Sequence, residues 1–352
     1  MPNGRPSPTA EPERTTGVHG PVDLCDGRGR LNPSARGWSR RPDVRANLRL
    51  APMRKKRWDY WCVQTDEIVV SFVYADVDYA GLASVWVLDR ATGHEATAGL
   101  LRPLSRGIEL PEQVCTGAMA VTDRALSLVI DERDGHTRLT ATAPTSAHGP
   151  IEVDVVVDKP AGHESLNVLI PWSTRRFQFT SKQNTRPAHG TVRVGDRTWS
   201  VDAERDGWGV QDLGRGVWPY SNRWNWAAAS GRSADGRVVG LQFGGKWTVG
   251  TGATENALCI DGKLTKIGVE LEWDYDWEHP MRPWRVRTPS SDRVDATLTP
   301  TFDRYDLTDL KVLRMEVHQC FGTWQGRVVG DDGVAVEFDG LRGFAEEARN
   351  RW

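Results

Sequence analysis

Short runs in which apolar and polar residues alternate recur along most of the chain. RRFQFTS, at residues 175–181, is the clearest case, because alternation places Phe177 and Phe179 on one face of an extended segment. Similar runs, rich in Val, Ile, Thr and aromatic residues, begin near residue 67 and recur as far as residue 338. Such runs at short spacing are typical of β-sandwiches and β-barrels. The pattern therefore predicts an all-β chain.

Asp-Gly pairs separate several of these runs. A tight hairpin needs positive φ at its centre, and Asp-Gly supplies it at little cost, so we expect antiparallel meanders with few helices. A short terminal helix is predicted at residues 343–352, GFAEEARNRW. The four pairs are Asp134-Gly135, Asp235-Gly236, Asp261-Gly262 and Asp332-Gly333.

The length of 352 residues and the distribution of the runs indicate two β units in tandem. We expect a disordered tail at residues 1–20, because this stretch is rich in Pro, Gly, Thr and charged residues. An N-terminal β unit then covers residues 21–170. A C-terminal unit, rich in tryptophan and ending in the short helix, covers residues 171–352.

Charge and cysteine content exclude several classes of function. The 45 basic and 47 acidic residues nearly cancel, so no global field favours nucleic acid or an anionic membrane, and no run approaches the ~18 apolar residues of a membrane span. The five cysteines contain no C-x-x-C pair, and GTGATE at 250–255 lacks the third glycine of a dinucleotide site. We expect a cytoplasmic protein without metal or cofactor, and assign no oligomeric state.

Tryptophan is the outlier of the composition, with sixteen residues, five of them within residues 198–226. Indole rings either fill a β core or form the apolar walls of a pocket that also needs a few placed polar groups. For the second case the expected wall residues are Trp208, Trp218, Tyr220, Trp224 and Trp226.

The same stretch supplies candidate acid–base groups. If residues 199–206 form a strand, Asp202, Glu204 and Asp206 share one face. On an outer face they form a solvated stripe, whereas on an inner face their mutual repulsion raises one pKa and yields a proton donor. Asp212 and Arg215, in a turn-rich loop, either lock that loop as an ion pair or serve a substrate, with Arg215 holding Asp212 ionised or facing an oxyanion.

Two further polar segments lie within β context. Lys182 and Asn184 follow the Phe177/Phe179 face, and Glu255 and Asn256 follow a glycine-rich approach. Each segment is either an ordinary solvated loop or a set of ligand contacts.

Several blocks of the sequence resemble those of an uncharacterised family, the domain of unknown function (DUF) family 2804. They are LCDGRGRLNPSARGWSR, RKKRWDYW, FQFTSKQNTRPAHGTV, DLGRGVWPYSNRWNW, GATENALCIDGK and RGFAEEARNRW. The segment from Gly190-Thr191-Val192 to Trp224-Asn225-Trp226 is distantly similar to the lipocalin-like group that contains hydroxyneurosporene synthase, a carotenoid hydratase. That resemblance implies two calycin-like β-barrel or sandwich units with an apolar cavity, and makes Asp206 and Asp212 candidates for the acid.

Two functions fit these residues. The first is binding of an apolar small molecule, a lipid or isoprenoid, in a Trp-lined cavity. The alternative is a hydratase or isomerase in which Asp212 or Asp206 protonates a carbon–carbon double bond and indole faces stabilise the cation. A purely structural or interaction protein would instead have no cavity.

Overall fold

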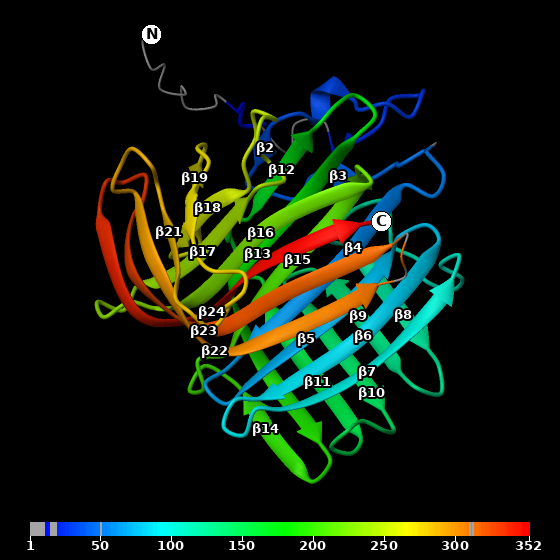
Figure 1. The fold of residues 1–352 in the computed structure, drawn as a ribbon, viewed down its shortest axis with the longest axis vertical. Coiled ribbons are helices and arrows are strands. Elements are labelled where there is room, and N and C mark those ends of the chain that lie inside the picture. The colour runs from blue at the N-terminus through cyan, green and yellow to red at the C-terminus, as the bar shows by residue number, and fades with distance from the viewer. Residues whose placement is uncertain (1–10, 15–19, 50, 310, 312) are drawn as a thin grey trace.

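The computed structural model describes residues 11–14, 20–49, 51–309, 311 and 313–352. Strands dominate these residues, so the predicted all-β class is confirmed (Figure 1). The helical element that they contain is one turn of 3-10 helix, η1 (Pro33–Ala35), and they hold no helix with the length and hydrophobicity needed to cross a membrane.

Within the described residues, the first large sheet has thirteen strands, in the order β7-β6-β5-β4-β15-β13-β11-β10-β9-β8; β12 and β14 also pair with β13, and β2 pairs with β12. Its pairs are antiparallel, whereas β1 (Val22–Asp23) and β3 (Val44–Arg45) form a separate parallel pair. The strands are β2 (Trp38–Ser39), β4 (Lys55–Gln64), β5 (Ile68–Asp76), β6 (Ala80–Asp89), β7 (His94–Pro103), β8 (Gly117–Thr122), β9 (Ser127–Arg133), β10 (His136–Ala143), β11 (Ile151–Asp158), β12 (Leu166–Pro171), β13 (Phe177–Val194), β14 (Arg197–Val201) and β15 (Trp208–Val217).

In the part of the chain that the structure describes, the second sheet has nine strands, in the order β19-β18-β17-β16-β24-β23-β22-β21-β20. Long strands from distant parts of the chain lie side by side here, and β24 pairs with both β16 and β23. The strands are β16 (Ser221–Arg232), β17 (Val238–Gly245), β18 (Asn256–Ile260), β19 (Lys263–Ile267), β20 (Glu272–Asp274), β21 (Trp284–Arg287), β22 (Val294–Asp309), β23 (Arg314–Val329) and β24 (Ala335–Arg351).

The hairpins follow the predicted turns. Asp134-Gly135 joins β9 to β10, Asp235-Gly236 joins β16 to β17, Asp261-Gly262 joins β18 to β19, and Asp332-Gly333 joins β23 to β24. The glycine of each pair has positive φ, the backbone conformation that a tight hairpin turn requires and that glycine adopts without strain. The antiparallel meanders expected from these pairs are confirmed.

Each sheet curls around its own apolar core. Val70 and Leu139 lie in the core of the first sheet, and Leu241 and Trp324 in that of the second. Further apolar clusters join residues of both sheets, as where Cys62 and Trp86 pack with Phe321. The molecule therefore consists of two curled half-barrels pressed together, which matches the expected tandem calycin-like units.

The predicted terminal helix is wrong, because residues 335–351 form β24. Ala, Glu and Arg favour a helix locally, but hydrogen bonding to strands on both sides outweighs that preference. The two sheets divide the chain between Val217 and Ser221, so the predicted unit boundary at 170/171 falls inside the first sheet, at the end of β12.

The predicted tail is only partly described, since residues 1–10 and 15–19 lie outside the described residues. Its described part contacts the body of the protein. The backbone N–H of Arg14 donates to the carbonyl of Trp38 at 2.7 Å, and Glu11 forms an ion pair of 2.6 Å with Lys266.

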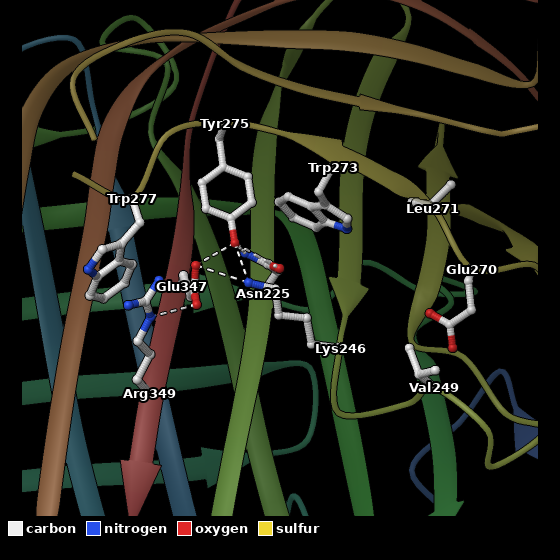
Figure 2. Close-up of a pocket in the computed structure, with 10 residues that line it drawn as sticks. All are labelled: Asn225, Lys246, Val249, Glu270, Leu271, Trp273, Tyr275, Trp277, Glu347 and Arg349. Carbon is white, nitrogen blue, oxygen red and sulfur yellow. Dashed lines mark hydrogen bonds and ion pairs between the residues drawn. The ribbon is translucent and has the colours of Figure 1, made fainter. Parts of the chain in front are cut away.

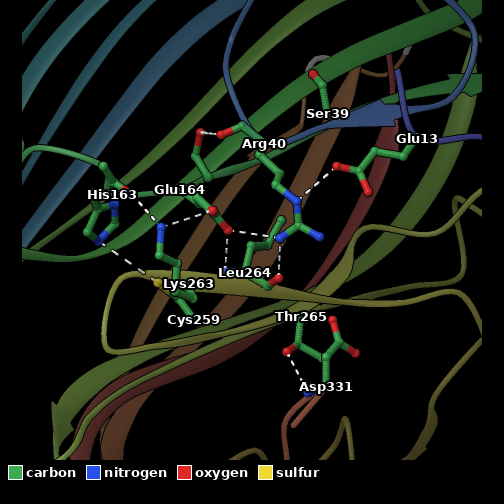
Figure 3. A network of polar contacts seen from close by, with 12 residues as sticks. Glu13, Ser39, Arg40, His163, Glu164, Cys259, Lys263, Leu264, Thr265 and Asp331 are labelled. Atoms are coloured by element: carbon green, nitrogen blue, oxygen red, sulfur yellow. Dashed lines mark hydrogen bonds and ion pairs between the residues drawn. The ribbon is translucent and has the colours of Figure 1, made fainter. Parts of the chain in front are cut away.

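A polar network ties the segment before β12 to the β18–β19 hairpin (Figure 3). One oxygen of Glu164 accepts from Arg40 at 2.8 Å and from the backbone N–H of Leu264 at 2.8 Å. The other oxygen pairs with Lys263 at 3.3 Å. Glu164 therefore joins the two sheets through charge-assisted hydrogen bonds, which are stronger than neutral ones.

A β-bulge in β13 forms a second connection. The register against β15 shifts between Gln183 and Arg186, and Thr185 within the bulge has φ of +53°. A β-branched residue rarely adopts this conformation, so surrounding contacts must hold it there. The Thr185 backbone N–H donates to Ser230 Oγ of β16 at 2.9 Å, and Asn184 donates to the carbonyl of Leu241 at 3.0 Å.

The bulge gives a test of this connection. Ser230→Ala leaves the buried N–H of Thr185 without its acceptor, so we expect the free energy of unfolding to fall by about 1–3 kcal/mol. Urea unfolding followed by tryptophan fluorescence measures it. Ser200→Ala, an exposed position on β14, is the control and should change stability by less than about 0.5 kcal/mol. Equal stability of the two variants would contradict this role for Ser230.

Candidate functional site

A buried group of charged side chains lies where the two sheets face each other. Lys182 of β13 and Asp212 of β15 are directly paired in the first sheet and both point toward the second. Their side chains form an ion pair, with 3.0 Å between Lys182 Nζ and Asp212 Oδ1. Asp212 also accepts hydrogen bonds from the indole of Trp58 at 3.1 Å and the hydroxyl of Thr180 at 3.2 Å.

The second sheet contributes two more carboxylates. Glu255, just before β18, lies 3.4 Å from Lys182 Nζ through Oε2 and accepts from Trp247 Nε1 at 2.5 Å through Oε1. Glu346 of β24 accepts from Trp224 Nε1 at 2.7 Å. We call Lys182, Asp212, Glu255 and Glu346 the inter-sheet cluster.

All four side chains of the cluster are buried, with residue exposures of 1–8 %. Burial raises the pKa of Glu255 to about 7, against the opposing attraction of Lys182, and raises the pKa of Glu346 to about 7. Burial disfavours the charge on Lys182, but Asp212 and Glu255 more than offset it and raise its pKa. The cluster therefore holds one permanent cation and two carboxyl groups that change protonation near neutral pH.

Two glycines, which have no side chain of their own, leave room for the side chains of Glu255 and Trp58. A Cβ on Gly244 of β17 would lie 2.0 Å from Cγ of Glu255, and a Cβ on Gly214 of β15 would lie 2.2 Å from the ring of Trp58. Any larger residue would displace the side chain. Glycine within a strand often marks such a close approach.

Indole rings enclose one side of the cluster. Trp218 lies at their centre and contacts five other rings, with centroid separations of 5.0–5.8 Å. Trp226 lies under the Lys182 ammonium, 4.2 Å from the ring centroid. The rings around Trp218 are Trp58, Trp172, Trp224, Trp247 and Trp352.

The structure brings together six of the residues singled out in the sequence. They are Lys182, Asp212, Trp218, Trp224, Trp226 and Glu255.

Arg215 lies on the other face of β15. QDLGRGV is part of this strand rather than a loop, so Asp212 and Arg215, three residues apart, point in opposite directions. Arg215 instead pairs with Asp59 of β4 at 2.5 Å, and both are 1 % exposed. The expected Asp212–Arg215 pair is wrong for this reason.

Asp206 lies in a turn, because the strand that was expected to span 199–206 ends at Val201. Asp202 ends it by accepting the backbone N–H of Arg205 at 2.9 Å, and Asp206 itself has φ of +54°. The expected single face of Asp202, Glu204 and Asp206 is therefore wrong. The Asp206 carboxylate accepts from Trp208 at 2.5 Å and from Arg342 at 2.6 Å, and neither partner belongs to the cluster.

The remaining predicted residues have other surroundings. Tyr220 is 43 % exposed between β15 and β16. Asn256 accepts from the Gly244 backbone N–H at 2.7 Å and donates to the carbonyl of Val269, so it braces the strand beside Glu255. Asn184 belongs to the bulge described above.

Sequence reasoning missed Glu346, Trp58 and Trp247. Glu346 was hidden by the helix prediction, although F-A-E-E-A-R, interpreted as a strand, places Phe344, Glu346 and Ala348 on one face. The tryptophans carried no local signal that separates them from core residues.

A pocket of about 480 Å³ lies on the second sheet (Figure 2). Its polar side is formed by Lys246, Tyr275, Glu347 and Arg349, and Asn225 connects Tyr275 to the backbone of β24. The Asn225 amide donates to Tyr275 Oη at 3.0 Å and to the carbonyl of Glu346 at 3.2 Å. Within the described ranges, no three His, Cys, Asp or Glu side chains are grouped to hold a metal ion.

Comparison with known proteins gives a family and a set of distant folds. Residues 15–352 match the family described as "Domain of unknown function (DUF2804)". No curated protein shows a significant match.

Among solved structures, a putative AttH from Nitrosomonas europaea is 12% identical, with 84% of this chain and 92% of that chain covered and a TM-score of 0.47. Kievitone hydratase from Nectria haematococca is 10% identical, with coverages of 86% and 91% and a TM-score of 0.46. CghA with Sch210972 is 10% identical, with coverages of 84% and 89% and a TM-score of 0.42.

The cluster predicts a pH dependence of stability. Folded Glu346 keeps its proton up to pH about 7, whereas an unfolded Glu loses it near pH 4.5. As pH rises from about 4.5 to 7, the unfolded state releases its proton first, so wild-type stability falls, by at most about 1.4 kcal/mol per pH unit for this group. Glu346→Gln has no proton to lose at this position, so its stability should rise relative to that of wild type as pH increases over that range.

Denaturant unfolding at pH 5, 6, 7 and 8 measures this difference. The gain of Glu346→Gln over wild type should level off above pH about 7. Glu337→Gln, exposed on the same strand, should show no such trend. A pH-independent difference for Glu346→Gln would exclude the raised pKa.

Proposed function

The chain belongs to the domain of unknown function family DUF2804, and because that description specifies no activity, we propose its function from the site itself. It binds a largely apolar small molecule, a lipid or isoprenoid with a polar group, between the two sheets at the inter-sheet cluster. One observation carries this proposal: three carboxylates and one lysine are buried together against a wall of indole rings.

Such burial has no evident benefit for folding. Buried ion pairs are often no more stabilising than apolar residues of the same volume, and a third carboxylate adds repulsion. Buried groups with shifted pKa values instead cluster at functional sites. The cluster therefore supports a role in recognition or chemistry.

The surroundings suit a ligand with an apolar body and one polar end. Ligand sites combine apolar and aromatic walls with a few placed polar groups. Here the rings around Trp218 form the wall, while Lys182 and Asp212 offer a donor and an acceptor. These rings contact one another, so the ligand separates them as it binds. The ligand enters from the side of Trp58, Trp172 and Trp224, because these three rings are only partly buried.

Retention of lipid tests this proposal. Protein stripped of bound lipid is incubated with a bacterial lipid extract, purified again, and analysed by mass spectrometry. We expect wild type to retain lipids or isoprenoids, and Trp218→Leu to retain about tenfold less, since about 50 Å² of lost apolar contact weakens binding by that factor. Trp199→Leu, in β14 and outside the indole wall, is the control.

Thermal unfolding verifies that both variants are folded. Recovery of only water-soluble metabolites, or equal retention by Trp218→Leu and Trp199→Leu, would contradict lipid binding at this site.

A second function is favoured by one specific observation, the raised pKa of Glu255 and Glu346 beside indole faces. A neutral carboxyl group transfers its proton to one carbon of a double bond, and the other carbon becomes a cation. Cation–π attraction from an indole stabilises this cation by about 0.5–2 kcal/mol. Water then adds and returns a proton to the carboxylate, or an adjacent C–H proton leaves to it, which gives hydration or isomerisation.

Deuterium incorporation tests this chemistry without a known substrate. Linalool, geraniol and squalene are incubated with the protein in D2O at pH 6 and analysed by mass spectrometry. We expect incorporation by wild type, and losses of about 10²–10⁴-fold in Glu255→Gln or Glu346→Gln, depending on which group is the acid. Asp212→Asn, which removes one of the two carboxylate partners of Lys182, tests the acid first expected from sequence. Deuterium incorporation that is unchanged in all three variants, or absent in wild type, would contradict acid catalysis at this site.

A further inference from the structure

We propose that the pocket on the second sheet is a separate binding site, and that it takes a planar aromatic or conjugated carboxylic acid (Figure 2). Its volume of about 480 Å³ lies within the range of small-molecule pockets, about 300–1,000 Å³. The proposal is independent of ligand binding at the inter-sheet cluster, since β16 and β24 separate the two sites.

An aromatic stripe forms one wall of the pocket. Leu271, Trp273, Tyr275 and Trp277 alternate with acidic residues, so their side chains share one face of the segment, and all four line the pocket. Tyr275 is fixed by stacking on Trp284, with 4.0 Å between ring centroids and 6° between planes. Flat, fixed rings favour a flat ligand, because stacking requires extended faces.

Arg349 supplies the group that recognises an acid. Its Nε donates to Glu347 at 2.8 Å, and its guanidinium carbon lies 3.7 Å from the ring centroid of Trp277. Among the described residues its two terminal nitrogens have no hydrogen-bond partner, and its side chain is 30 % exposed. A guanidinium fixed on an indole face presents two parallel donors, which match the two oxygens of a carboxylate.

The carboxylates of the pocket do not repel such a ligand. The negative charge of Glu347 is already balanced. Lys246 lies 3.0 Å from its Oε2, which also accepts from the Tyr275 hydroxyl, and Arg349 donates to its Oε1. Glu270 accepts from the hydroxyl of Thr248 at 3.0 Å, and burial raises its pKa. The Lys246 side chain is 37 % exposed and adds a second cation at the rim. An incoming acid therefore meets two cations, Lys246 and Arg349, while the charge of Glu347 is already paired.

Titration of the full chain with 2-naphthoate and with uncharged 2-naphthamide, followed by calorimetry, tests the proposal. Wild type should bind 2-naphthoate about tenfold or more tightly than 2-naphthamide. Arg349→Gln should weaken 2-naphthoate about tenfold and 2-naphthamide by less than about threefold. Trp277→Leu should weaken both. Arg327→Gln is the control, because this partly exposed arginine of β23 pairs with Asp292 outside the pocket and should leave both affinities unchanged.

Three results would overturn the proposal. They are no binding of 2-naphthoate to wild type up to about 1 mM, equal affinities of wild type for the acid and the amide, and an unchanged 2-naphthoate affinity in Arg349→Gln. The first two use the unaltered chain, so they hold even if a variant fails to fold. Loss of lipid retention at the inter-sheet cluster would not affect this outcome.

Discussion

The burial of Lys182 among three carboxylates is the constraint around which the two sheets are arranged. A buried charge is tolerated only when it is paired and hydrogen-bonded. Each carboxylate of the cluster accepts an indole N–H, from Trp58 for Asp212, Trp247 for Glu255 and Trp224 for Glu346. With all three acids ionised, the cluster would carry an excess of negative charge. The raised pKa of two of them removes this excess near neutral pH.

The packing of the sheets follows from this requirement. The bulge at Thr185 lies three residues beyond Lys182 and anchors β13 to β16, which fixes the height of the lysine between the sheets. Gly214 and Gly244 leave room for Trp58 and Glu255 on opposite sides of the cluster. The strained backbone at Thr185 in β13 and the glycines in β15 and β17 thus all accommodate the inter-sheet cluster.

Much of the fold could be predicted from sequence because its signals are local. Alternation identified the strands, and four Asp-Gly pairs identified four hairpins. The last segment could not be predicted this way, because Ala, Glu and Arg in β24 favour a helix until two neighbouring strands pair with them. The site was half predicted. Tryptophan density and polar residues in β context pointed to Asp212, Lys182 and Glu255. The glycines of QDLGRGV indicated a loop where β15 runs, so Arg215 was expected beside Asp212 and not on the opposite face.

The alternation of β24 has a further consequence. Glu346 and Glu347 are consecutive, and their side chains leave the strand on opposite faces, one toward the inter-sheet cluster and the other toward Tyr275. Asn225 holds the carbonyl of Glu346 and the hydroxyl of Tyr275 with one amide group. The peptide unit between Glu346 and Glu347 therefore borders both sites, and each site owes one of its carboxylates to the same short stretch of β24.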